Sequence, residues 1–234
     1  MSANSAPCHI GLLLFPGMTQ IDFAGPYDVF ARLPDTIVHV VAKTADPVRT
    51  ERGLVLVPTV TCEACPQLDV LVVPGGPGQQ QLMDDEEVLA FLRRQAQQAK
   101  YVTSVCTGAL VLGAAGLLKG YRATTHWLSL PLIALFGAIA VDERVVIDGN
   151  RMTGGGCTAG IDFALRLAAM LRGETVAQQI QLQLEYNPDP PFRSGSPATA
   201  PADLVATVRR AAERFQRERA QTCERVSKRL DAAA

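Results

Sequence analysis

Short apolar runs alternate with segments of helical periodicity along most of this chain. The runs are rich in β-branched residues and have the length of strands buried on both faces of a parallel sheet. They are 9–15, 36–42, 68–73 and 101–105. The helices predicted between and after them are 26–33, 84–100, 107–118, 158–171 and 174–184. This alternation predicts an α/β fold, doubly wound around a mostly parallel sheet with helices on both faces.

The remaining segments show weaker patterns of apolar and polar residues. The segment 122–127 predicts a brief strand that leads into a helix. The other short strands or hairpin arms expected are 53–59, 139–141, 145–148 and 151–153. The Pro- and Ser-rich segment 187–201 predicts an extended connection, and apolar residues then recur at helical spacing as far as Leu230. We therefore expect one domain over residues 8–190. Residues 191–234 would add the end of that connection and an amphipathic helix, without a separate domain.

Composition narrows the class of protein. The chain has 234 residues, 48% hydrophobic and 19% charged, with a net charge of −1, which supports a sizeable core and gives no electrostatic reason to expect a nucleic-acid partner. Charges, Pro or Gly interrupt every apolar run before it could span a membrane. Residues 1–7 lack the pattern of a secretory signal and predict a short lead-in without regular structure. Six cysteines without such a signal favour a reducing, cytoplasmic location.

Cys106 stands where the strand 101–105 gives way to a helix of small and aliphatic residues. A thiol at this turn lies at the carboxyl edge of the sheet, where open α/β folds bind ligands. The free N–H groups and the positive end of the helix dipole would stabilise a thiolate there. The alternative is that Cys106 is a small buried hydrophobic residue, which is a common fate of a free cysteine.

Other loops leave the predicted strands at the same edge. Asp22 lies in the loop after the first strand, just ahead of a helix that Pro26 would open, and Gly75 and Gly76 follow the third strand. Backbone amides of such a glycine loop can face a ligand, and Thr107 directly follows the thiol. Together they predict nucleophilic thiol catalysis, with Asp22 moving a proton and its pKa raised by a neighbouring thiolate. The alternative for Asp22 is a helix N-cap.

Several further residues favour structural roles. Cys62 and Cys65 form a C-x-x-C without a second pair of metal ligands at zinc spacing, and they do not open a helix. His126 resembles a structural residue at a helix start, and Cys157, before an apolar helix, is expected in the core. The C-terminal arginines predict a solvated or oligomer-facing helix rather than a nucleic-acid site. They are Arg209, Arg210, Arg214, Arg217, Arg219, Arg225 and Arg229.

The combined motifs resemble the ThiJ/PfpI superfamily. The stretches that carry the resemblance are "IDFAGPYDVF", "VLVVPGG", the strand–Cys–helix turn and "GNRMTGGGCTAGIDFAL", so that it covers about residues 8–190. It implies the flavodoxin-like fold of the class I glutamine amidotransferases, with Cys106 at a nucleophile elbow. Within the superfamily, "YVTSVCTGALVLGAAGLL", "RATTHW", "QLQLEYNPDPPF" and "GSPATAP" are similar to the branch that hydrates isonitriles.

That resemblance implies a cysteine-dependent lyase that adds water to an isonitrile and yields an N-substituted formamide. It implies a homodimer that needs neither a cofactor nor a metal. Cys106 would be the nucleophile, Asp22 the acid and base, and Thr107 the residue beside the nucleophile, while Gly75 and Gly76 would supply substrate-binding amides. In PfpI proteases a His follows the nucleophilic Cys, so Thr107 argues against peptide hydrolysis.

Two other classes of function stay open from the residues. A hydrolase or a glyoxalase-like enzyme that acts on reactive carbonyls could use the same thiol and acid. A regulatory, ligand-binding relative of the AraC-type transcription regulators could share the domain. However, the segment after the Pro-rich connection is too short for their two helix-turn-helix units, and the net charge of −1 is not basic.

Overall fold

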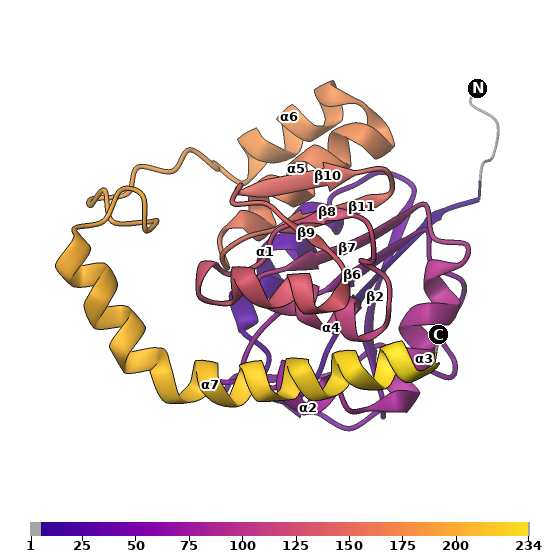
Figure 1. Ribbon diagram of the computed structural model, residues 1–234. Coiled ribbons are helices and arrows are strands. Elements are labelled where there is room, and N and C mark those ends of the chain that lie inside the picture. The colour runs from indigo at the N-terminus through magenta and orange to yellow at the C-terminus, as the bar shows by residue number, and fades with distance from the viewer. Residues whose placement is uncertain (1–5, 234) are drawn as a thin grey trace.

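A seven-stranded sheet forms the centre of the computed structural model, which describes residues 6–233 (Figure 1). Most of the N-terminal lead-in thus lies outside the described residues. The strand order is β10-β11-β7-β6-β1-β2-β5, and every neighbouring pair is parallel except β10 and β11. In that order the strands span Val145–Asp148, Arg151–Gly154, Tyr101–Val105, Val70–Val73, Cys8–Leu13, Thr36–Ala42 and Val60–Thr61. The predicted mostly parallel sheet is confirmed, and its five central strands follow the flavodoxin-like order.

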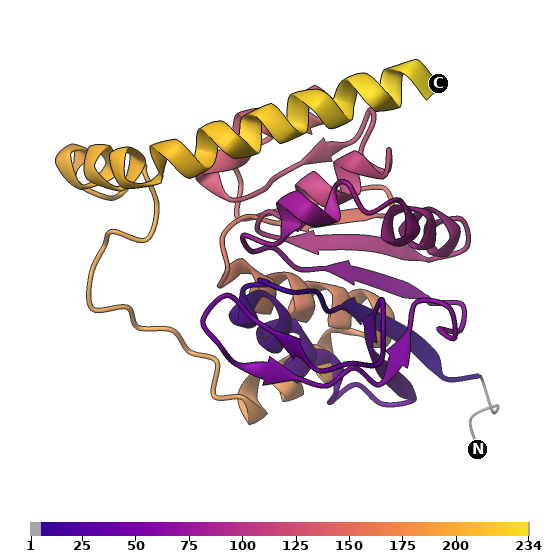
Figure 2. The same ribbon diagram turned by 90° about the horizontal axis from the view of Figure 1, so that it is seen from below.

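Helices cover both faces of this sheet, as the two views show (Figures 1 and 2). One face carries α1, α5 and α6, in which α5 packs against both α1 and α6. They span Gln20–Phe30, Ala159–Arg172 and Glu174–Gln183. The other face carries α2, α3, α4, the 3-10 helix η1 and α7, which span Gln79–Leu82, Glu86–Ala96, Gly108–Ala114, Trp127–Phe136 and Ala202–Ala233. The central strands are buried between these layers, which explains their nearly continuous apolar sequences.

Two small sheets flank the main one. Strands β3 (Val48–Arg49) and β4 (Val55–Leu56) form an antiparallel hairpin, which confirms the hairpin arm predicted over 53–59. Strands β8 (Arg122–Ala123) and β9 (Ile139–Ala140) pair in parallel on either side of η1. The brief strand predicted ahead of a helix at 122–127 is therefore confirmed, although that helix is of the 3-10 type.

The start of α1 differs from the prediction. The helix begins at Gln20, so Asp22 lies in its first turn instead of the preceding loop, and Pro26 lies inside the helix. Pro26 removes only one backbone donor from the helix, while the turn before it is closed by the Asp22 N–H donating to the Thr19 carbonyl at 3.1 Å. Asp22 is not the N-cap residue, which is Thr19. The alternative of a capping aspartate is therefore wrong.

The C-terminal helix α7 docks through its second half. Cys223 and Val226 are fully buried against η1 and α4. The Arg225 guanidinium donates hydrogen bonds to both carboxylate oxygens of Asp84, at 2.6 and 2.7 Å. The first turns extend away from the sheet (Figures 1 and 2), Arg209 then lies 4.9 Å from the centre of the Trp127 ring of η1, and Leu204 and Val208 are exposed. None of the helices within residues 6–233 is long and apolar enough to cross a bilayer.

Candidate active site

Cys106 lies in a sharp turn between β7 and α4, as predicted. Its φ of +54° is in the left-handed region that residues with a side chain rarely adopt, at a cost of about 1–2 kcal/mol. The turn is held at both ends, because the Cys106 N–H donates to the Gly154 carbonyl at 3.0 Å and the Thr125 hydroxyl donates to the Cys106 carbonyl at 2.7 Å. A Cβ on Gly108 would lie 2.0 Å from the Val73 carbonyl oxygen, so only glycine lets α4 start this close to β6.

Asp22 reaches the same place from the first turn of α1. The residue is fully buried, and its Oδ2 accepts a hydrogen bond from the Gly75 N–H at 3.0 Å. Its Oδ1 is buried without a hydrogen bond of regular geometry. A buried carboxylate with one unpartnered oxygen is costly to keep, and such groups concentrate at functional sites.

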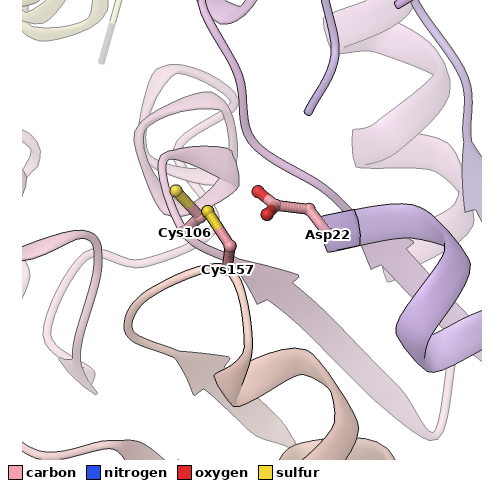
Figure 3. Close-up of side chains that lie close together, drawn as sticks. All are labelled: Asp22, Cys106 and Cys157. Carbon is pink, nitrogen blue, oxygen red and sulfur yellow. The ribbon is translucent and has the colours of Figure 1, made fainter. Parts of the chain in front are cut away.

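Cys157 is the third member of the site. It follows β11, the next strand along the sheet, and its side chain lies beside Cys106 and Asp22 (Figure 3). The two sulfurs and one carboxylate oxygen lie within 4.8 Å of one another. Cys157 is partly buried and packs against the core, as predicted, but its sulfur also lies in the site, which the prediction did not include. The same convergence of loops at strand ends that places the other two side chains also applies to the loop 154–157, and this signal was available in the sequence.

Electrostatics couple the three groups. Burial raises the pKa of Asp22 to about 6, against nearby donors that lower it, first the Cys157 thiol and then the Gly75 amide. The predicted direction of this shift is confirmed, but its main cause is burial rather than repulsion by a thiolate. The pKa of Cys106 is raised well above its usual value by the contact with Cys157, by burial and by the charge of Asp22.

The resting protonation state follows from these shifts. The Thr107 amide acts in the opposite direction and favours a Cys106 thiolate, but it does not outweigh the other causes. The helix start therefore favours the thiolate, as expected, while the contact with Cys157, burial and the charge of Asp22 together raise the Cys106 pKa. Near neutral pH, Asp22 is mostly ionised and Cys106 keeps its proton, which places a base next to a thiol.

The glycine loop after β6 serves the site in a way that the sequence did not indicate. Both of its amides donate to side chains, Gly75 to Asp22 and Gly76 to the Thr107 hydroxyl, each at 3.0 Å. These two amides are not available to a ligand, because the loop lies directly against α1 and α4. The observed contacts instead fix the positions of the Asp22 and Thr107 side chains. A role for Gly75, Gly76 and Thr107 in substrate binding stays a prediction.

Arg219 of α7 lies close enough to Cys106 for the two groups to interact electrostatically. Its side chain is buried instead of solvated, contrary to the prediction for this helix, and Nη1 donates to the Ser129 hydroxyl at 2.9 Å. Burial lowers its pKa, while Cys106 and Cys223 lie close enough to favour its charged form. No carboxylate among residues 6–233 pairs with Arg219. A buried cation without an acidic partner therefore borders the site.

His126, Cys62 and Cys65 are not part of the cluster of Asp22, Cys106 and Cys157. His126 precedes η1 and accepts a bond from the Leu128 N–H at 3.4 Å, which fits the structural role expected for it. Cys62 and Cys65 carry free thiols in another part of the fold, and burial raises the pKa of each to about 11. A surface cavity of about 970 Å³ lies between the ends of β1 and β6 and the strand β3, but neither Cys106 nor Asp22 lines it.

The fold and this site define a class of protein. It is a flavodoxin-like α/β protein in which a cysteine with positive φ, in the strand-to-helix turn at the carboxyl end of a central strand, lies close to a buried carboxylate from the first helix. Comparison with known proteins makes the assignment specific. The family model described as "DJ-1/PfpI family" matches residues 9–170, and the chain belongs to this family.

Individual relatives refine the picture. The chain is 58% identical over 222 residues to the isonitrile hydratase of Pseudomonas putida, a match that covers 95% of this chain and 97% of that protein. A crystal structure of a ThiJ/PfpI family protein from Pseudomonas syringae superposes with a TM-score of 0.90 at 45% identity, covering 94% of this chain and 90% of that one. The resemblance predicted from the motifs is therefore confirmed.

A more distant relative tests the regulatory alternative. The HTH-type transcriptional regulator GbdR of Pseudomonas aeruginosa is 31% identical over 192 residues, which cover 78% of this chain but only 52% of the regulator. The similarity thus accounts for about half of that protein.

Proposed function

We propose that this protein is an isonitrile hydratase, a lyase that adds water to an isonitrile and releases an N-substituted formamide. The observation that carries the proposal is the contact between Cys106 at the elbow and the buried Asp22, with their sulfur and carboxylate within 4.8 Å. The class of substrate comes from the isonitrile hydratase of Pseudomonas putida, which matches this chain over nearly its whole length.

The first half-reaction uses both groups. The Cys106 sulfur attacks the terminal carbon of the isonitrile and forms a carbon–sulfur bond. The Asp22 carboxylate accepts the thiol proton and passes it to the same carbon, which gives a thioimidate with a C–H bond. The unpartnered Oδ1 of Asp22 is free to take that proton, because Oδ2 is already engaged by the Gly75 amide.

The second half-reaction again uses Asp22 first as a base and then as an acid. Water attacks the thioimidate carbon while Asp22 accepts one of its protons. Asp22 passes that proton to the substrate nitrogen, the carbon–sulfur bond breaks as the added hydroxyl becomes the formamide carbonyl, and the hydroxyl proton returns to the departing Cys106 sulfur. One water is consumed for each isonitrile, and each proton that Asp22 takes up is returned.

Neighbouring groups hold these two in place. Thr107 belongs to the same centre, since its amide faces the Cys106 sulfur and its hydroxyl is oriented by the Gly76 N–H. Gly75 is a positioning residue that fixes one oxygen of Asp22. A displacement of about 1 Å in such groups can cost about 100-fold in rate, so these contacts are part of the catalytic apparatus.

The test is direct. The purified protein is incubated with a simple alkyl isonitrile, and formamide is followed by NMR, beside a parallel incubation with methylglyoxal in which lactate is followed. We expect formamide only, and Cys106→Ala should abolish it. The matched control is Cys65→Ala, which removes a partly exposed thiol outside the site. Undiminished turnover by the folded Cys106→Ala protein, or turnover of methylglyoxal alone, contradicts the proposal.

The assembly and location form a further part of this proposal. A homodimer is supported by aliphatic side chains exposed on the β3–β4 hairpin, just beyond it and on the first half of α7, namely Leu54, Val55, Val57, Leu204 and Val208. Light scattering on the eluting protein tests it, and a monomer would contradict it. Six free thiols support a cytoplasmic location. The docking of α7 supports a single domain over 8–190, with 191–234 as its extension.

A further inference from the structure

We infer that Asp22, Cys106 and Cys157 also form a binding site for one thiophilic divalent cation, Zn²⁺ or its analogue Cd²⁺, whose occupation blocks the nucleophile. The reaction proposed above uses no metal, and this inference concerns a second ligand of the same three side chains. It depends on Cys157, which the hydration chemistry does not use.

The geometry suits tetrahedral coordination. Zinc binds thiolate sulfur at about 2.3 Å and carboxylate oxygen at about 2.0–2.2 Å, so ligand atoms around one ion lie about 3.5–3.8 Å apart. The two sulfurs and one Asp22 oxygen already lie within 4.8 Å of one another. Side-chain adjustments of about 1 Å therefore bring all three to coordination distance. Figure 3 shows the two sulfurs side by side and the carboxylate opposite them.

An unpartnered oxygen points to a ligand at this place. Asp22 is fully buried, its Oδ2 is held by the Gly75 amide, and its Oδ1 has no regular hydrogen bond. A buried carboxylate oxygen in this condition gains from a positive neighbour. A cation bound between Oδ1 and the two sulfurs would satisfy it, while Gly75 keeps the carboxylate oriented, as groups behind metal ligands commonly do.

The donor set selects the kind of ion. Two sulfurs and one oxygen suit zinc and cadmium and are poor ligands for Mg²⁺ or Ca²⁺, which prefer oxygen. Three protein ligands leave a fourth position for water, as in open zinc sites. Binding replaces the two thiol protons with the metal, and protons are released to solvent. A Cys106 sulfur bound in this way cannot attack a carbon, so the ion and the isonitrile exclude each other.

Direct binding measurements test the site without any isonitrile. The reduced protein is titrated with Cd²⁺, and the ultraviolet charge-transfer absorption reports the thiolates bound per ion. Calorimetry with Zn²⁺ supplies the Kd. We expect one ion and two thiolates per chain. Cys106→Ala and Cys157→Ala should each weaken binding by more than about 100-fold, since even the loss of a group behind a ligand costs about 10–100-fold.

A control variant and two contrary results make the binding test decisive. The matched control is Cys62→Ser/Cys65→Ser, which removes two thiols from the same chain outside the site and should leave the Kd unchanged. Tight binding that survives Cys157→Ala, or that disappears in the control variant, overturns the inference. X-ray absorption of the zinc complex of the Cys62→Ser/Cys65→Ser protein then counts the sulfur neighbours of the ion with the C-x-x-C pair removed. Two sulfur neighbours support the site, and four sulfurs or none contradict it.

Discussion

Gly75→Ala isolates the packing on which the proposed chemistry depends. A Cβ at this position would lie 2.5 Å from the Thr107 amide nitrogen, 2.7 Å from its hydroxyl oxygen and 2.9 Å from the Asp22 Oδ2. An ordinary contact needs 3.4 Å or more, so the backbone nitrogen must move by about 0.9 Å and the carboxylate oxygen by about 0.5 Å. The Gly75 N–H is retained, and its φ is outside the left-handed region, so only the added methyl group acts.

The size of the effect follows from which groups must move. The Thr107 nitrogen adjoins Cys106 and begins α4, so the methyl group displaces the nucleophile relative to the acid. A misplacement near 1 Å costs about 100-fold in kcat/KM, or about 2.7 kcal/mol in the activation barrier. Overpacking also lowers the free energy of unfolding by about 1–3 kcal/mol.

The assay measures kcat/KM for an isonitrile beside urea unfolding at the same temperature. Gly195→Ala is the matched control, because a Cβ there meets no atom within 4 Å. The control should keep wild-type activity and stability. A folded Gly75→Ala protein with kcat/KM within a factor of two of wild type would refute the reasoning, because the close contact of this loop with Asp22 and Thr107 would then be irrelevant to catalysis.

Three further predictions concern the charges of the site. Asp22→Asn should lower kcat/KM by about 10²–10⁴-fold. In the wild type, kcat/KM should fall about tenfold per pH unit below about pH 6, where the Asp22 carboxylate becomes protonated, and pH–rate profiles should show no such fall in the variant. Because the folded-state pKa of Asp22 is raised from 3.8 to about 6, its favourable contribution to stability is complete below pH 3.8 and is lost as the pH rises through 6. Asp22→Asn should therefore gain up to about 3 kcal/mol over wild type at pH 8 and little at pH 4 in urea unfolding, and equal gains at both would contradict this. Arg219→Met should leave the free energy of unfolding within about 1 kcal/mol or raise it, since no carboxylate compensates the buried guanidinium; a loss above about 3 kcal/mol in urea unfolding would reveal a compensating partner.

The sheet was predictable because burial on both faces demands continuous apolar sequence. The runs at 36–42 and 101–105 coincide with β2 and β7, residue for residue. The start of α1 was not predictable in the same way, because Pro26 fits equally well at the first position of a helix or within one whose earlier turn has its own bonds. Which of these occurs depends on how α1 packs against α5, and the local sequence does not contain that information.

The candidate site was predictable in its two main groups and not in its surroundings. Cys106 and Asp22 follow strands, and the convergence of strand ends in parallel sheets is a general rule. Partners of the Gly75 and Gly76 amides depend on angstrom-scale contacts between loops, which no local pattern encodes. Arg219 was expected in solvent because charged residues usually lie there, and only the docking of α7 on η1 buries it.

Cys157 differs from the rest of the site in its position, because it follows β11, which is nearer to the edge of the sheet. Cys106 and Asp22 are both buried, at the end of a central strand and in the helix that follows β1, whereas Cys157 is partly exposed. Only β10 lies between β11 and the edge of the sheet, and a Cβ on Gly156 would meet no atom within 4 Å. Mutation can therefore exchange the thiol at 157 for a hydroxyl or an aliphatic group at small structural cost. Among related enzymes, we expect this position to diverge quickly and to set how each nucleophile responds to metals and oxidants, while the reaction itself stays the same.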